Sequence, residues 1–425
     1  MQMLTTSLLL TWGIAGMTAL GIIVRPFRWP EAIWAVSGAV LLAAFGLLSL
    51  PAVWTGIAKG FDVYLFLIGM MLLSELARKE GLFDWLAVIA TSHAKGSPKR
   101  LFLLIYAVGI LVTVFLSNDA TAVVLTPAVY AATRAARVKD PLPYLLICAF
   151  IANAASFVLP ISNPANLVIF GGGHMPPLAD WLRTFTLPSV VAIAATYAGL
   201  YWTQRRVLAA DRVAADVESP HLSAAAKVAG AGLTVTAIGL VLASAFNLDL
   251  GLPTFIAGIA TMALIVVVTR EAPFSMLRGI SWSVLPLVAG LFVIVEALIG
   301  TGLIRSLADA LVFYGAEAPK WTAAIAGMAV AVVSNLVNNL PAGLVAGSAV
   351  QAAQASSTIS GAILIGVDLG PNLSVTGSLA TILWLNALRR ENIHVSAWQF
   401  LGIGIVVMTP ALLLSLAALL LTAPM

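Results

Sequence analysis

Short polar loops divide this sequence into long apolar tracts. Hydrophobic residues make up 61% of the 425 residues and charged residues only 9%, against about 25% charged residues in a typical soluble domain. In lipid every backbone polar group must be satisfied within its own segment, so such tracts fold as helices. The sequence therefore predicts an all-α polytopic membrane protein, with apolar tracts at roughly 4–24, 32–56, 62–77, 101–116, 119–133, 141–170, 184–203, 228–246, 253–269, 281–300, 321–334, 340–356, 361–388 and 396–421.

Two pairs of neighbouring tracts are too short to cross the bilayer comfortably. One pair flanks the LSNDAT motif (116–121) and the other flanks the NLVNNLP motif (335–341). Sixteen helical residues extend about 24 Å, whereas the hydrocarbon core is about 30 Å thick. We predict two re-entrant hairpins, at 101–135 and 319–356, with their tips near the bilayer midplane. Two tight, full-length helices in each pair are the alternative.

The distribution of Lys and Arg predicts which way the helices run, because cytoplasmic loops are enriched in both residues. We place both termini outside and thread about ten transmembrane helices and the two hairpins. All but four of the 22 Lys and Arg residues then fall on the cytoplasmic side, the exceptions being Lys59, Arg183, Arg305 and Lys320. We therefore expect a multi-pass protein of the cytoplasmic (inner) membrane.

The second half of the sequence repeats the first. The segment that begins at Glu75 aligns with the segment that begins at Glu296, without a gap, at an offset of 221. A further match, at an offset of 206, aligns NPANLVIFGG with GPNLSVTGS and so pairs Asn166 with Asn372. Two related halves are therefore expected.

The predicted topology enters one repeat from outside and the other from inside, so the repeats are inverted. Repeat 1 spans 1–203 and repeat 2 spans 227–425. The polar segment 204–226 between them holds the longest charged run of the chain and is predicted to be a cytoplasmic linker loop. Each repeat also contains one long tract that we predict to be a broken helix, at 141–170 and 358–388.

Inverted repeats with interrupted helices are the architecture of secondary transporters, which hold their substrate where the breaks meet. Besides the two hairpin tips, Pro164 and Pro371 interrupt the long tracts, because proline lacks the N–H that an intact helix requires. Irregular backbone at this depth is tolerated only beside protein or a wet cavity. The four breaks are expected to form one substrate site from Ser117, Asn118, Thr121, Ser162, Asn163, Asn166, Asn338, Asn339, Asn372, Ser374 and Thr376.

These side chains are amides and hydroxyls, and the sequence places no Lys or Arg at midplane depth. An anionic substrate would normally want a fixed cation, or bound sodium ions with helix N-termini. Amides both donate and accept hydrogen bonds, which suits a small neutral polyhydroxy solute or a cation shared with carbonyl groups. Asparagines that only cap the broken helices are the alternative.

Four carboxylates are predicted to lie within the membrane, where acids are costly and commonly carry protons. Asp119 belongs to the tip motif itself and is the leading proton-coupling candidate, with an N-cap that stays ionised as the alternative. Glu296 and Asp368 are further candidates. Glu75 is followed by Arg78 and could equally face water.

Other classes of protein are disfavoured. A single cysteine, Cys148, excludes internal disulfides, and the four histidines fall in loop-like stretches, so we expect no cofactor and no metal. Basic residues spread over many short loops do not indicate nucleic-acid binding. An intramembrane hydrolase would need a base to activate Ser117, and no histidine is predicted at that depth.

The FLSNDATAVVLTP tip, the ISNPANLVIFGG break and the overall size resemble the ArsB arsenite–antimonite efflux permeases of the ion transporter superfamily. The resemblance covers essentially the full length. Relatives with this architecture include sodium-coupled dicarboxylate carriers, NhaD-type sodium/proton antiporters and silicate effluxers. Dicarboxylate carriers place Ser-Asn-Thr at both tips, whereas this sequence has Ser-Asn-Asp at Ser117 and Asn-Asn-Leu at Asn338, which argues against sodium-linked carboxylate uptake.

The resemblance implies a secondary antiporter, not an enzyme, that exports trivalent arsenic or antimony hydroxides in exchange for protons and so confers arsenical resistance. Asn118, Asn166, Asn339 and Asn372 would bond the substrate hydroxyls while Asp119 takes up the proton. The ArsA ATPase is an optional partner, and the oligomeric state stays open, with a homodimer among the options. A sodium/proton antiporter of the same fold is the alternative function.

Overall fold

The computed structural model of the protein describes residues 2–170, 175–214 and 221–422, and within these ranges it contains helices but no strand. In the first half the elements are α1 (Gln2–Val24), η1 (Pro26–Arg28), α2 (Glu31–Ala44), α3 (Leu50–Lys59), α4 (Phe61–Lys79), α5 (Leu82–His93), α6 (Pro98–Phe115), α7 (Asn118–Ala120), the π-helical turn η2 (Thr121–Leu125), α8 (Thr126–Ala135), α9 (Leu142–Ala154), η3 (Pro160–Ser162), α10 (Pro164–Ile169) and α11 (Leu178–Ala210). In the second half they are α12 (Ala224–Ala245), α13 (Gly251–Thr269), α14 (Phe274–Leu277), α15 (Val284–Gly300), α16 (Leu303–Glu317), α17 (Pro319–Val337), α18 (Asn339–Ala353), α19 (Ser357–Leu369), η4 (Gly370–Leu373), α20 (Leu379–Arg390) and α21 (Ala397–Thr422).

Helix length and composition fit a multi-pass membrane protein, and the predicted fold class is confirmed. Within the described ranges, seven helices are long and apolar enough to cross a membrane alone. Two bent pairs pass the same test together: α3 with α4, at 47°, and α15 with α16, at 72°. The hairpin arms α6 and α17 are among the seven, so they are longer than their apolar tracts suggested. Each helix has an additional polar first turn, which begins at Pro98 in α6 and at Pro319 in α17. Whether the hairpins re-enter the membrane at their tips stays a prediction.

The elements of the two halves begin at equivalent positions. Helices α5 and α16 follow Gly81 and Gly302, both left-handed with φ of 76° and 83°, a conformation that favours glycine. Helices α6 and α17 open on the equivalent prolines. The offset of 221 therefore holds for the structure as well as for the sequence, through both hairpin tips.

The broken helices follow a different offset from the one that their sequences suggest. Helix α9 begins at Leu142 and α19 at Ser357, while the helices after the breaks begin at Pro164 and Leu379, so the structural offset is 215 in both places. The predicted offset of 206 is wrong. The matching residues belong to different local structures. The first Asn-Leu pair lies inside α10, after its break, and the second lies in η4, within the break between α19 and α20. Residues 171 and 172 of that alignment lie outside the described ranges.

The last helices of the two halves show how the halves are related. The hydroxyl of Ser415 in α21 donates to the carbonyl of Pro188 in α11, at 3.2 Å, while Gly199, further along α11, packs on Val407, earlier in α21. Helices α11 and α21 therefore run antiparallel. Because they are counterparts, the two halves are inverted relative to each other.

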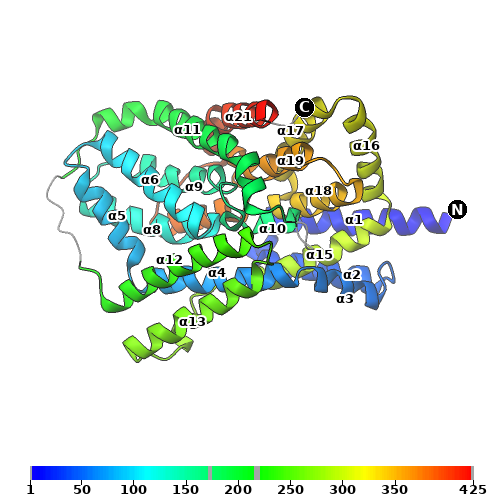
Figure 1. The fold of residues 1–425 in the computed structure, drawn as a ribbon, viewed down its shortest axis with the longest axis horizontal. Helices are drawn as coiled ribbons and strands as arrows, with labels where there is room; N and C mark the ends of the chain where they lie inside the picture. Colours follow the sequence, from blue (N-terminus) through cyan, green and yellow to red (C-terminus); the bar gives the residue numbers. More distant parts are fainter. Residues whose placement is uncertain (1, 171–174, 215–220, 423–425) are drawn as a thin grey trace.

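The halves also interlock. Gly69 of α4 packs on the backbone of Thr254 and Gly258 in α13, and Gly290 of α15, the counterpart of α4, packs on Ala35 of α2. Figure 1 shows α4, α12 and α13 along one edge of the molecule and α11 and α21 along the opposite edge. Helices α9 and α19 lie in the core, because nearly all their residues are buried.

The predicted linker 204–226 is shorter in the structure. Helix α11 continues to Ala210, since the residues RRVLAA favour helix, and α12 begins at Ala224. Residues 215–220 lie outside the described ranges. The linker start is tied to the loop after hairpin 1, because the backbone N–H of Ala214 donates to the carbonyl of Ala136 at 2.8 Å.

Candidate functional site

Each hairpin tip starts a new helix at an equivalent residue. At the first tip the Ser117 hydroxyl accepts from the backbone N–H of Ala120 at 3.2 Å. At the second tip the Asn338 side-chain oxygen accepts from the backbone N–H of Leu340 at 3.3 Å. Both residues are N-caps, which satisfy the unpaired N–H groups of the first helical turn.

The two broken helices restart in the same way. After the first break the side-chain oxygen of Asn163 accepts from the N–H of Ala165 at 3.0 Å. After the second break the hydroxyl of Ser378 accepts from the N–H of Thr381 at 3.1 Å. Asn163 and Ser378 are counterparts at the offset of 215, so the polar cap is retained although the residue type differs.

A small cavity of about 20 Å³ lies where the four helix starts meet, and we call it the central cavity. Apart from Ala380, its lining consists of six pairs of counterparts from the two halves. These pairs are Val63 and Val284, Leu67 and Val288, Asn118 and Asn339, Asp119 and Leu340, Asn163 and Ser378, and Pro164 and Leu379. The central cavity therefore lies on the pseudo-twofold axis that relates the halves.

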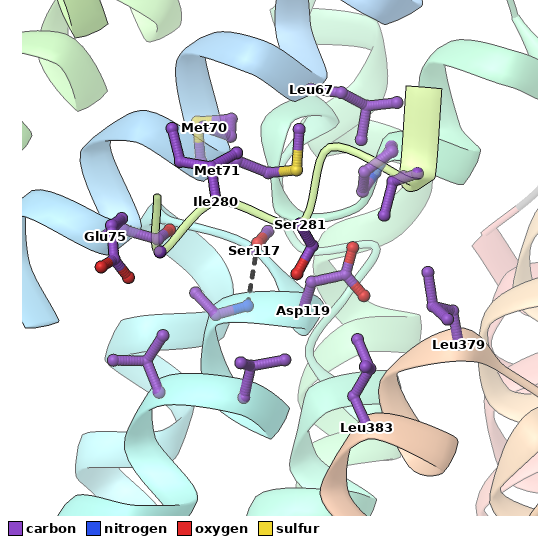
Figure 2. Close-up of a pocket in the computed structure, with 17 residues that line it drawn as sticks. Leu67, Met70, Met71, Glu75, Ser117, Asp119, Ile280, Ser281, Leu379 and Leu383 are labelled. Atoms are coloured by element: carbon purple, nitrogen blue, oxygen red, sulfur yellow. Dashed lines mark hydrogen bonds between the residues drawn. The ribbon is translucent and has the colours of Figure 1, made fainter. Parts of the chain in front are cut away.

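A second cavity of about 70 Å³, the side cavity, adjoins it along α4. Leu67, Asp119 and Leu379 are among the residues that line both cavities. Figure 2 shows the Asp119 carboxylate among the lining residues, between Ser281 and Leu379, with the Glu75 carboxylate at the far edge and turned away. Asp119 thus lies at the junction of the two cavities.

Three polar groups of the central cavity have capacity to bind a ligand. Among the described residues none donates a hydrogen bond to the Asp119 carboxylate. The side-chain amide of Asn339 and the amide nitrogen of Asn118 are also without a protein partner in the described part of the chain; the Asn118 oxygen accepts from the Asp119 N–H at 2.9 Å. Two counterpart amides and one acid therefore face one space.

Asp368 differs from Asp119, because its carboxylate is fully buried and both oxygens accept hydrogen bonds. The Ser156 hydroxyl donates to one oxygen at 2.6 Å, and the Asn163 amide donates to the other at 2.8 Å. Asp368 is not among the lining residues of either cavity. It fixes Asn163 from the opposite half of the chain.

Asn153 is the counterpart of Asp368 and makes the equivalent cross-connection. Its amide donates to the Asn372 side-chain oxygen at 2.9 Å, and the Asn372 amide donates to the carbonyl of Phe150 at 2.9 Å. The end of each first helix segment, α9 or α19, is thereby bonded to the break of the other half. These cross-connections hold the two breaks together behind the central cavity.

The two glutamates form ion pairs away from the helix starts. Glu296 accepts from Lys59 at 2.6 Å, and Glu75 accepts from Arg78 at 2.5 and 2.7 Å. Glu75 lines the outer part of the side cavity, whereas Glu296 lines neither cavity. The Lys59 partner from α3 was not foreseen, because it lies far from Glu296 in the sequence.

Several predicted site residues are instead used within the breaks. Asn166 is fully buried, and its amide donates to the carbonyls of Ser156, Leu159 and Pro160. The remaining predicted residues outside the cavity linings bond to protein as well: Thr121 to Thr113, Ser162 to the Val114 carbonyl, Ser374 to Asn335, Thr376 to the Asn335 carbonyl, and Asn338 to the Thr376 carbonyl. Of the predicted substrate ligands, Asn118, Asn163 and Asn339 line the central cavity and Ser117 lines the side cavity.

Sequence reasoning missed Ser378 and Ser281, which line the cavities, and the buried supports Asn153 and Ser156. The offset of 215 would have found Ser378 as the counterpart of Asn163. Ser281 lies in the loop before α15 and carries no comparable sequence signal. Neither cavity is lined by a Lys or Arg among the described residues, and Asp119 is the ionisable side chain at the helix starts.

Inverted halves, four helix breaks and a largely apolar cavity with a few polar groups on their shared axis define a membrane transporter. Residues 19–367 match the family described as citrate transporter, and the chain belongs to this family. It is 30% identical over 404 residues to the arsenical pump membrane protein of Escherichia coli K12, covering 91% of this chain and 92% of that protein. The arsenical pump membrane protein of Yersinia enterocolitica is also 30% identical, over 420 residues, with 91% and 95% covered.

Two further proteins are similar over most of the chain, one in sequence and one in fold. An uncharacterized transporter of Mycobacterium tuberculosis H37Rv is 26% identical over 372 residues, covering 84% of this chain and 85% of that protein. The crystal structure of the YdaH transporter of Alcanivorax borkumensis superposes with a TM-score of 0.56 at 15% identity, over 95% of this chain and 98% of that chain. The ArsB-type family resemblance seen in the sequence is confirmed.

Proposed function

We propose that this protein exports trivalent arsenic and antimony, as their neutral hydroxides, in exchange for protons. The observation that carries the proposal is the composition of the central cavity. Among the described residues, the Asn339 amide and the Asn118 amide nitrogen have no protein partner, Asp119 supplies one carboxylate, and no cation lines the cavity. A neutral pyramidal hydroxide offers three O–H groups that donate and accept hydrogen bonds, as amides do. The arsenical pump relatives support this choice of cargo.

The same cavity disfavours citrate, the substrate in the description of the matched family. Citrate carries up to three negative charges, and an anion in a site without cations would be close to the Asp119 carboxylate. Like charges in a site of low dielectric repel strongly. A citrate carrier of this fold would need bound cations to offset both sets of charge.

Asp119 is proposed as the proton-coupling acid, because it is the only carboxylate of the central cavity within the described chain and accepts no hydrogen bond there. It would hold a proton while the site faces one side and release it on the other, in alternation with the solute. Each proton that moves inward gains about 2.3 kcal/mol per 100 mV of membrane potential. That gain would drive export of the uncharged solute.

We further propose the cytoplasmic (inner) membrane as the location, with both termini outside and the linker inside. The distribution of Lys and Arg supports this orientation. The linker would then be the segment on which an ArsA-type ATPase could dock.

The test is uptake of radiolabelled arsenite by everted membrane vesicles energised with a proton gradient. We expect wild type to accumulate arsenite against its gradient. Asp119→Asn should abolish accumulation but retain exchange of arsenite across the membrane, because the amide has nearly the same size and can still bond to the solute, but it cannot take up and release a proton. Asp309→Asn, on the exposed face of α16, is the matched control and should behave as wild type.

Three outcomes would contradict the proposal. Accumulation of arsenite against its gradient by Asp119→Asn would show that another acid carries the proton. Sodium-dependent proton flux without arsenite transport would make the protein a cation antiporter. Citrate transport in place of arsenite transport would make it a carboxylate carrier.

A further inference from the structure

The counterpart pairs that line the central cavity match in chemical character in all cases but one. Five of its six counterpart pairs match in character, as two apolar residues, two amides, or two capping residues and the apolar residues that follow them. The sixth pair is Asp119 and Leu340, an acid in one half and an isobutyl group in the other. The charge of the cavity is therefore set at this pair alone.

Leu340 occupies the same place in its helix as Asp119 does. Both follow the first residue of a helix whose N-cap lies at the hairpin tip, Ser117 or Asn338. The backbone N–H of each is bonded to a nearby asparagine oxygen, at 2.9 Å for Asp119 and 3.3 Å for Leu340. Since both residues line the same cavity, an acid at 340 would face the same space as Asp119.

A second acid would change what this space binds. Two carboxylates and the oxygens of Asn118 and Asn339 would form the all-oxygen environment that hard cations prefer. Two like charges in a small buried site need a cation or a shared proton between them. A leucine at this position leaves one acid and an apolar wall, which gives a desolvated cation too few oxygens.

We propose that Leu340 determines the selectivity of the site by excluding monovalent cations such as sodium, so that only a proton neutralises Asp119. The neutral cargo rests on the proposed function, whereas the exclusion of sodium does not. Residue 340, the counterpart of Asp119 across the pseudo-twofold axis, thus determines whether the site exchanges protons or binds metal cations. The experiment uses sodium binding, which requires no knowledge of the cargo.

The test is equilibrium binding of ²²Na⁺ to the purified full-length chain in detergent at neutral pH. Wild type and Leu340→Asn should give background binding only, and Leu340→Asp should give saturable binding. The double variant Asp119→Asn with Leu340→Asp restores a single acid and should return to background. Purification of Leu340→Asp in acidic buffer lets the added carboxyl fold uncharged, and Leu340→Glu is the second variant if it fails to fold.

Saturable sodium binding by wild type, or background binding by folded Leu340→Asp and Leu340→Glu, would overturn the inference. Arsenite uptake by vesicles is measured in parallel with the same proteins. If wild type excludes sodium and Leu340→Asp binds it, but wild type does not transport arsenite, the proposed function fails and the inference stands. If wild type transports arsenite but the acidic variants bind no sodium, the inference about Leu340 fails and the proposed function stands.

Discussion

Replacing Asp368 tests whether this acid carries a proton during transport or only stabilises the fold. The carboxylate accepts one hydrogen bond from Ser156 and one from Asn163, and the single Ser156 hydroxyl proton is shared with the carbonyl of Asn153, at 2.7 Å. In Asp368→Asn the amide oxygen can accept from Asn163, and the amide nitrogen can donate to Ser156, which keeps its bond to Asn153. We expect unfolding free energy to change by no more than about 1 kcal/mol. The counterpart position already carries an amide, in Asn153.

Asp368→Ala should behave differently. It leaves the Asn163 amide buried without an acceptor, at a cost of about 1–3 kcal/mol, and frees the cap of α10, worth about 0.5–2 kcal/mol. The expected loss is therefore about 1.5–5 kcal/mol. Denaturant unfolding of the purified proteins should rank wild type and Asp368→Asn together, well above Asp368→Ala.

Transport decides the interpretation. Asp368→Asn should keep proton-driven arsenite accumulation in everted vesicles. The KM for arsenite should rise only if the substitution displaces Asn163, which lines the central cavity. Loss of accumulation by a variant that unfolds like wild type would refute this reasoning, because it would show that Asp368 carries a proton. Asn153→Asp is the matched variant, since it places an acid at the counterpart position.

Two further predictions test the scaffold and the second ion pair. In Gly69→Ala the new Cβ would lie 2.4 Å from the carbonyl oxygen of Thr254, so α4 and α13 must separate. We expect the free energy of unfolding, measured with denaturant, to fall by about 1–3 kcal/mol. Gly239→Ala is the control and should cause no loss, because its Cβ would enter open space. A loss from Gly239→Ala equal to that from Gly69→Ala would contradict the close packing. Glu296→Gln removes a partly exposed pair with Lys59 and should cost less than about 1 kcal/mol. Its vesicles should keep proton-driven uptake, and loss of coupling would assign the proton to Glu296.

Local sequence is enough to locate the helix breaks. Ser117, Asn163 and Asn338 each precede a new helix, and side chains that cap a helix act on backbone groups two or three residues away. Apolar tracts likewise predict helices wherever they are long enough to require internal hydrogen bonds. Because these interactions connect residues that are close in the sequence, the four breaks and the repeat at an offset of 221 could be predicted. Re-entry of the hairpins stays a prediction.

Tertiary structure determines which polar residues face the cavity and which support the helix breaks. Asp119 and Asp368 are both acids in apolar surroundings, and only contacts from the other half of the chain bury the second one against Ser156 and Asn163. Asn166 and Asn339 look alike in sequence, but one amide is used by the backbone of its own break and the other faces the cavity. An amide bonds equally well to a carbonyl or to a ligand, so its role depends on which of them the packing of the two halves brings within reach.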